Sequence, residues 1–236
     1  VSGKGIVLTS QKDDTVGGQS NSTAQVAASG DWRGLRIEKS TAASGASAFN
    51  DLLVRYGGSD AGAAMTVRGV SPSLQYLQVT DSSTGLRLLD AASPTISGSS
   101  FLRNGVGLEA DGNSAPVIGS TQFSHNDSEA ILNKTPATLI QATGNWWGHV
   151  SGPKDPVGNP QGQGDAVSAG VKYSGFLTAV PLLNPTVRLA APSPFFEQSA
   201  VALELSCVNA TEYRVAENGG FSGVAFQPLA NGRAAV

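Results

Sequence analysis

Charged side chains and cysteine are both scarce in this chain. Asp, Glu, Lys and Arg make up 14% of its 236 residues, compared with about 25% in an average soluble domain. The net charge is -3 and the basic residues are scattered, which argues against the basic surface of a nucleic-acid-binding protein. Cys207 is the only cysteine, which excludes an internal disulfide and a cysteine-based zinc site.

Long apolar runs and helical patterns are missing as well. No apolar run approaches the roughly 20 residues needed to span a membrane, and no segment keeps the spacing of roughly 3.6 residues that marks an apolar helix face. Gly, Ser, Ala and Thr are abundant instead, and they favour short strands and tight turns. The hydrophobic share of 40% is enough for a core. We therefore expect an all-β fold.

A repeat with a constant interval runs through the middle of the chain. Ser71-Pro72, Ser93-Pro94 and Ala115-Pro116 are evenly spaced, and apolar residues around them keep the same register. The matching sets are Leu74, Ile96, Ile118 and Ile140; Val79, Phe101 and Phe123; Leu86, Leu108 and Ala130; and Leu88, Ala110 and Leu132. A fixed period of about 22 residues is typical of a strand-built solenoid.

The apolar positions within each unit alternate over short stretches, so we interpret each unit as one coil of two or three strands. Stacked coils pair each strand with its copy in the next coil, in parallel and about 4.8 Å away. The matching sets then become buried ladders, and each coil is stable only through its neighbours. Ser82, Asn104 and Asn126 recur at the same interval, and their side chains are expected to hydrogen-bond along the axis. The predicted parallel β-helix covers residues 1–148, with less regular coils before residue 71.

Three parts of the sequence resemble a known family. They combine a double-aspartate, double-glycine loop and a Gly-Asp-Trp strand with a Tyr-Gly-Gly segment and a Trp-Trp-Gly segment near the end of the repeat. They are residues 8–18 and 30–35, residues 54–58, and residues 143–148 with 151–153 and 162–168. This pattern is similar to that of the bacterial right-handed parallel β-helix proteins of the pectate-lyase-like superfamily, and the similarity covers about residues 5–183.

The resemblance implies a single-stranded, right-handed parallel β-helix built on the repeat, in a secreted or cell-surface protein with no assigned activity. The chain departs from the family pattern in the loop that follows the double glycine. The family continues its double glycine with further acidic residues, whereas this chain continues with residues 19–22, Gln-Ser-Asn-Ser. Asp13 and Asp14 are the candidate metal ligands, but calcium takes six to eight oxygens, roughly, from several groups. We expect a solvated turn at this place and no cofactor.

A second candidate site is the column of Asp81, Arg103 and His125, which are separated by the interval of the repeat. An acid, a guanidinium and an imidazole in a row would suit binding or deprotonation of a uronic acid. Polysaccharide lyases of this fold use stacked carboxylates for calcium and a basic residue as the base, whereas this column offers one carboxylate only. Opposite charges on neighbouring strands also form simple surface ladders, and we expect such a ladder. The two carboxylates that a glycosidase needs, roughly 5 to 10 Å apart, do not fall in register in the regular coils.

The third candidate is the aromatic pair Trp146 and Trp147. Asn145 continues the repeat column of Phe123, so the pair follows directly where the pattern breaks. Two neighbouring tryptophans suit either a carbohydrate-stacking platform or a plug over the last coil, and we expect the plug. Glycosylation acceptor patterns occur at Asn21, Asn126, Asn133 and Asn209.

The remainder of the chain changes character. Residues 149–185 are rich in Pro, Gly, Asn and Gln and are expected to form a cap and linker. Within residues 186–236, Val201, Leu203, Leu205 and Cys207 alternate with small or polar residues, and 212–215 and 224–227 are further candidate strands. This part is similar to an immunoglobulin-like module, which takes about 100 residues. We therefore expect a partial module that continues beyond Val236 or pairs with another molecule.

The sequence leaves three functions open. The first is a non-catalytic extracellular structural or adhesive protein, a stalk or filament subunit on the cell surface. Its partners would be further copies of the chain, joined through the open β-helix end and the incomplete C-terminal segment. The second is a polysaccharide lyase or hydrolase acting on acidic polysaccharide. The third is a carbohydrate-binding module. The fold itself does not choose among them, because function depends on the site.

Overall fold

The computed structural model describes residues 5–19, 23–38, 47–60, 62–189, 203–215, 224–229 and 233–235. These residues form strands and turns, and none of them lies in a helix. The chain divides into two units, Val1–Pro181 and Leu182–Val236. No helix of the described residues is long and apolar enough to cross a membrane.

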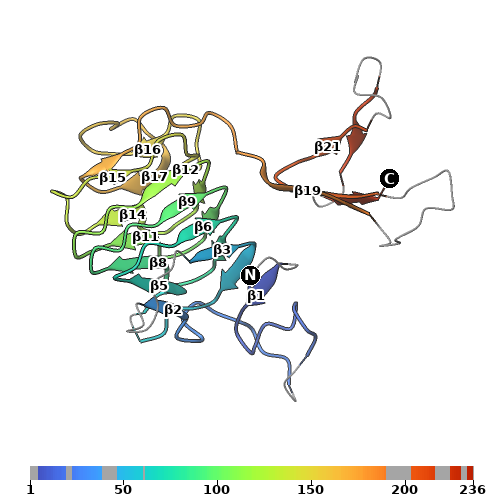
Figure 1. Cartoon of the computed structure of the whole chain (residues 1–236), viewed down its shortest axis with the longest axis horizontal. Helices are drawn as coiled ribbons and strands as arrows, with labels where there is room; N and C mark the ends of the chain where they lie inside the picture. The colour runs from blue at the N-terminus through green and yellow to red at the C-terminus, as the bar shows by residue number, and fades with distance from the viewer. Residues whose placement is uncertain are drawn as a thin grey trace. The chain divides into compact units, whose positions relative to one another are not determined.

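The first unit is a parallel β-solenoid of about four turns (Figure 1). From β1 to β15, successive strands fall in turn in three sheets, and all pairings within these sheets are parallel. The first sheet contains, in order, β1 (Ile6–Leu8), β4 (Leu52–Arg55), β7 (Gln78–Thr80), β10 (Ser100–Leu102) and β13 (Gln122–Ser124).

The second sheet contains, in order, β2 (Leu35–Glu38), β5 (Met65–Arg68), β8 (Thr84–Leu89), β11 (Val106–Ala110), β14 (Glu129–Asn133), β17 (Gly164–Val167) and β16 (Pro153–Lys154). The third sheet contains β3 (Ala48–Asn50), β6 (Ser73–Gln75), β9 (Thr95–Ser97), β12 (Val117–Gly119), β15 (Ile140–Gln141) and β18 (Val171–Lys172). The segment expected to be a cap and linker thus also contributes β16, β17 and β18 to two of these sheets.

The predicted register of the repeat is confirmed in the central turns. Phe101 pairs with both Val79 and Phe123 in the first sheet. Ile96 pairs with Leu74 and Ile118 in the third sheet, and Leu86 pairs with Leu108 in the second. All of these side chains are buried. Apolar residues lie above like residues because the parallel ladder repeats the inward positions of each coil.

The register departs from prediction in the coil that contains β13, β14 and β15, where the coil lengthens. The columns predicted to continue to Ala130 and Leu132 are wrong at this point, because Leu108 pairs with Ile131 and Ala110 with Asn133. One additional residue is accommodated between Asn126 and Glu129. Surface turns absorb such insertions readily because their backbone has few packing constraints.

A second additional residue lies between Asn133 and Gln141. Val117 pairs with Gln141, so Ala142, and not Ile140, continues the column of Ile118. The predicted column from Phe123 to Asn145 is wrong for the same reason. The Asn145 side chain bonds the backbone of Thr121, and the buried ring of Trp147 follows Phe123.

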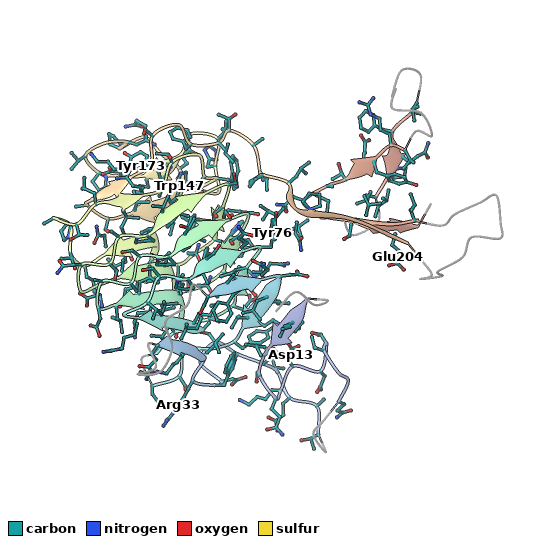
Figure 2. All side chains as sticks on the ribbon, in the orientation of Figure 1. Asp13, Arg33, Tyr76, Trp147, Tyr173 and Glu204 are labelled. Carbon is teal, nitrogen blue, oxygen red and sulfur yellow. The ribbon has the colours of Figure 1, made fainter. Side chains whose placement is uncertain are left out.

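An aromatic stack fills the centre of the first unit. The rings of Phe101 and Phe123 are 5.2 Å apart at 10°, and those of Phe123 and Trp147 are 5.1 Å apart at 13°. The ring of Tyr173 lies 6.4 Å from that of Trp147 at an angle of 79°, and Figure 2 labels both residues. Burial of such a ring contributes about 1.5 to 3 kcal/mol, and a stacked pair adds about 0.5 to 1.5 kcal/mol.

The expected amide ladder is also present. The Asn104 side-chain oxygen accepts from the Ser82 N–H at 3.2 Å, and the Asn126 side-chain oxygen accepts from the Asn104 N–H at 3.1 Å. The side-chain NH₂ group of each asparagine is used as well, since Asn104 donates to Val79 O and Asn126 to Phe101 O. These buried amides hydrogen-bond the backbone of the corner between the first and second sheets.

The second unit is a small antiparallel arrangement. β19 (Leu183–Leu189), β20 (Leu203–Val208) and β23 (Arg233–Ala235) form one sheet, and β21 (Glu212–Tyr213) and β22 (Gln227–Pro228) form a pair. β20 contains the predicted alternating residues Leu203, Leu205 and Cys207, while Val201 lies outside the described residues. Strand structure in the two other predicted segments covers Glu212–Tyr213 and begins again at Gln227.

Replacing Phe123 with Ala should destabilise the first unit strongly. The ring is fully buried between Phe101 and Trp147, and loss of a buried Phe costs about 3 to 5 kcal/mol. Trp32, Trp146 and Trp147 are the chain's three tryptophans and all lie in this unit, so urea unfolding followed by tryptophan fluorescence reports on it. The control is Val117→Ala, at a side chain that is 53% exposed, which should cost less than about 1 kcal/mol. Equal losses for the two variants would contradict the stacked core.

Candidate functional site

The predicted column of Asp81, Arg103 and His125 lies at one corner of the solenoid, directly after β7, β10 and β13. The three residues have positive φ values of 54°, 54° and 59°, and Tyr56, directly after β4, has 61°. Such values are uncommon outside glycine, so their recurrence marks the same sharp turn in four successive coils. The turn directs these side chains along one edge, which we call the corner ladder.

Asp81 and Arg103 form the central contact of the corner ladder. Arg103 Nε and Nη2 donate to the two carboxylate oxygens of Asp81 at 2.7 and 2.9 Å. Partial burial alone would raise the pKa of Asp81, but hydrogen bonds from Arg103 and Thr80 and the charge of Arg103 outweigh it and hold the pKa below its ordinary value. Because a guanidinium occupies both oxygens, this carboxylate is ionised and already bound on both sides.

A second ion pair lies near Asp81 at the N-terminal end of the corner ladder. Arg55 Nη2 is 2.5 Å from Asp13 Oδ2, and both side chains are mostly buried. Thr9 and Thr15 also donate to the Asp13 carboxylate, at 2.5 and 2.6 Å. Burial would raise the pKa of Asp13, but these hydroxyl groups and the Arg55 charge lower it. Asp13 therefore fastens the loop after β1 to β4.

The neighbouring candidate ligand, Asp14, is half-buried, and its Oδ1 has no hydrogen-bond partner among the described residues. A metal site needs further ligands around such an oxygen. The described part of the chain contains no group of three or more His, Cys, Asp or Glu that could hold a metal ion. The two aspartates are thus not joined by a third acidic ligand within these residues.

His125 and Asp165 stand at the other end of the corner ladder. The exposed His125 ring has its Nδ1 2.7 Å from Ser124 Oγ. Asp165 accepts the His125 backbone N–H with its Oδ1 at 3.0 Å, so its bond to this residue is through the main chain. Its Oδ2 accepts the N–H and the side-chain amide of Asn126 at 2.9 and 2.7 Å. Serine, histidine and aspartate are therefore close together, but without the relay geometry of a catalytic triad.

Sequence reasoning missed Asp165 because it does not lie on the repeat. It terminates the amide ladder of Ser82, Asn104 and Asn126 with a carboxylate that comes from β17. Burial raises the pKa of Asp165, and the hydrogen bonds from Asn126 and His125 oppose that rise only in part. The one signal in the sequence was its position in the 162–168 segment that carries the family resemblance.

The two tryptophans have different environments. Trp147 is fully buried, with the Phe123 ring stacked on it and the Tyr173 ring perpendicular to it. It occupies the place of a plug over the last aromatic layer, and no face of its ring is open to a sugar. Trp146 is half-buried and its backbone bridges to Gln122 in the first sheet. A platform built from both rings side by side is therefore not formed in this structure.

The glycosylation acceptor patterns also separate by burial. Asn126 and Asn133 are 7% and 5% exposed, and their amides donate to backbone oxygens of Phe101 and Thr138. Asn209 is exposed, and Asn21 lies outside the described residues. Only the Asn209 amide, among the three described, has the accessibility that a glycan requires.

A scan of protein-family models, a search of curated proteins and a search of solved structures each gave no match to this chain. The site is therefore interpreted from its geometry. Arg103 binds Asp81 in the corner ladder and Arg55 binds Asp13 beside it, and buried amides follow next to them. This arrangement can hold coils in register through charge-assisted hydrogen bonds.

Replacing Asp165 with Asn should change the pH dependence of stability. Because its pKa in the folded state lies above 3.8, the folded protein binds this proton more tightly than the unfolded chain. The contribution of Asp165 to stability therefore falls as the pH rises from 3.8 through the raised pKa. Urea unfolding at several pH values should show the wild-type-minus-variant free energy falling over this window and levelling off above it. A difference that stays flat or rises would contradict the raised pKa.

Proposed function

We propose that this protein is a non-catalytic extracellular structural or adhesive protein, a stalk or filament subunit on the cell surface. In this proposal the solenoid is a right-handed β-helix of the pectate-lyase-like type. The second unit belongs to an immunoglobulin-like module that connects the stalk to a neighbouring module or subunit.

The ion pairs and hydrogen bonds at the corner ladder are the observation that supports the proposal most directly. Its acidic side chains, and those beside it, are already bound by groups of the same or neighbouring coils. Arg103 occupies both oxygens of Asp81, Arg55 holds Asp13, and Asp165 accepts three hydrogen bonds from His125 and Asn126. A general base needs an oxygen or nitrogen free to reach a substrate proton, whereas these carboxylates fasten one coil to the next.

The buried interior supports the same conclusion. The aromatic stack from Phe101 to Trp147 and the amide ladder from Ser82 to Asn126 each connect successive coils, so bending the solenoid there would break several contacts together. Interiors packed in this way have low compressibility and transmit strain. That property suits an element whose role is to hold two attached parts at a fixed distance.

Surface location is the first testable part of the proposal. In cells that produce the protein, an antibody against the folded solenoid should label intact cells, or the protein should be recovered from the medium. Trypsin added to intact cells should remove the cell-associated signal, while a cytoplasmic marker protein stays intact. Labelling that appears only after the cells are permeabilised would contradict a cell-surface or secreted stalk.

The alternative, a lyase or hydrolase of acidic polysaccharide, is tested by assay. We expect no turnover of polygalacturonate or alginate, with or without added calcium, because Asp81 is neutralised by Arg103. A lyase would release unsaturated uronides, which are detected by their ultraviolet absorbance, and a hydrolase would create new reducing ends. Turnover that disappears in both Asp81→Ala and Arg103→Ala would replace the stalk proposal with the enzyme.

A further inference from the structure

The N-terminal end of the solenoid exposes strand edges and part of its apolar interior. β1, β2 and β3 are the last strands of their three sheets, and each pairs with only one neighbour among the described residues (Figure 1). Between them lies an apolar hollow of about 160 Å³, lined by Ile6, Leu8, Leu35, Phe49, Asn50 and Leu52. Unpaired edges beside exposed apolar surface favour association with another strand.

The free edge of β2 carries a specific pattern of charge. The Leu35 N–H donates to Ala64 O at 2.8 Å, so the backbone groups of Leu35 and Ile37 face β5. Successive residues of a strand direct their backbone groups to opposite edges, which leaves those of Arg36 and Glu38 at the free edge. The side chains of Arg36 and Glu38 are 61% and 45% exposed and form an ion pair at 2.9 Å.

We infer that this end binds the same end of a second copy of the chain, with β2 pairing antiparallel to β2 of the partner. A twofold axis at Ile37 places Arg36 opposite Glu38 of the partner subunit, and Glu38 opposite Arg36 of the partner subunit. Residues that exchange both backbone hydrogen bonds lie directly opposite each other in an antiparallel pair. The backbone groups available at the edge therefore belong to the same two residues whose charges are complementary in this register.

The hollow supports the same arrangement. The side chains of Leu35 and Ile37 are half-buried and pack against the core, on the opposite face of β2 from Arg36 and Glu38. Antiparallel pairing about the twofold axis brings the apolar hollows of both molecules to the same side of the joined sheet. Ile6, which is 40% exposed, and the half-buried Phe49 would then have apolar surface opposite them.

The other end of the solenoid is a poorer partner for this edge. There Trp147 covers the aromatic stack, and Tyr173 and Phe176 pack against the core beside it. The apolar interior at that end is already enclosed by the chain itself. Contact between two N-terminal ends is isologous and closes after two molecules, so the inference is a dimer. It rests on the solenoid end alone and holds whether or not the molecule is a stalk.

Charge reversal tests the dimer directly. The mass of the full chain in solution, measured by sedimentation over a range of concentrations, should show a monomer–dimer equilibrium. Arg36→Glu and Glu38→Arg each place like charges opposite each other across the twofold axis, and each should raise the dimer dissociation constant about tenfold or more. The double variant Arg36→Glu with Glu38→Arg restores both pairs and should dimerise like the wild type.

Mixing the two single variants is the most specific measurement. Arg36→Glu carries two acidic residues at the edge and Glu38→Arg two basic ones, so a mixture should form heterodimers although each alone is mainly monomeric. Asp127→Arg, at an exposed residue between β13 and β14, is the control and should leave dimerisation unchanged. A chain that is monomeric at all concentrations would overturn the inference. Association that survives both single reversals, or a mixture that stays monomeric, would overturn this register.

Discussion

Parallel pairing of each strand with its copy in the next turn is the constraint on which the rest of the structure depends. It requires that whatever one coil directs inward is followed by a compatible side chain one coil later. The column from Val79 through Phe101 and Phe123 to Trp147 meets this requirement with apolar side chains. The column from Ser82 through Asn104 and Asn126 to Asp165 meets it with hydrogen-bonding groups. A polar residue in the first column or an apolar one in the second would leave its neighbours without partners.

Closing each coil in so few residues strains the backbone at the corners of the solenoid. Asp81, Arg103 and His125 adopt positive φ at the same place, which side chains other than glycine tolerate poorly. The amides beside them bond the backbone groups that the turn exposes, and the ion pair of Asp81 with Arg103 connects two corners. The strained turns and the hydrogen bonds that offset their strain thus repeat at the same interval along the chain. The same turn that creates the strain also aligns the charges.

Sequence reasoning identified what repeats at a constant interval, and it failed where the interval changes. Phe101 with Phe123 and Asn104 with Asn126 were predictable because both spacing and residue type recur. The prediction placed Asn145 after Phe123 in the buried column, two positions before Trp147, which occupies that place. The pattern of buried residues does not reveal insertions in surface turns. The partnerships of Asp13 with Arg55 and of Asp165 with Asn126 join segments of irregular coils, where no period indicates which residues meet. In such regions the path of the backbone determines which residues meet, and amino-acid composition does not determine that path.

Nothing in a column of like side chains limits how many coils can stack. Each end of a solenoid therefore needs a structural feature of its own. At the C-terminal end the buried column increases in size from Val79 to Phe123 and then to Trp147, and Tyr173 turns its ring across the last layer. With these rings in place, a further coil would have no equivalent inward position for its side chain. At the N-terminal end the column instead opens into a hollow, and the edge of β2 carries one positive and one negative charge on either side of Ile37. An edge with opposite charges on either side of its centre complements itself only when the partner runs in the opposite direction. Parallel addition of a strand with the same order of charges would place like charges opposite each other, so the edge distinguishes a closed pair of molecules from continued growth of identical coils.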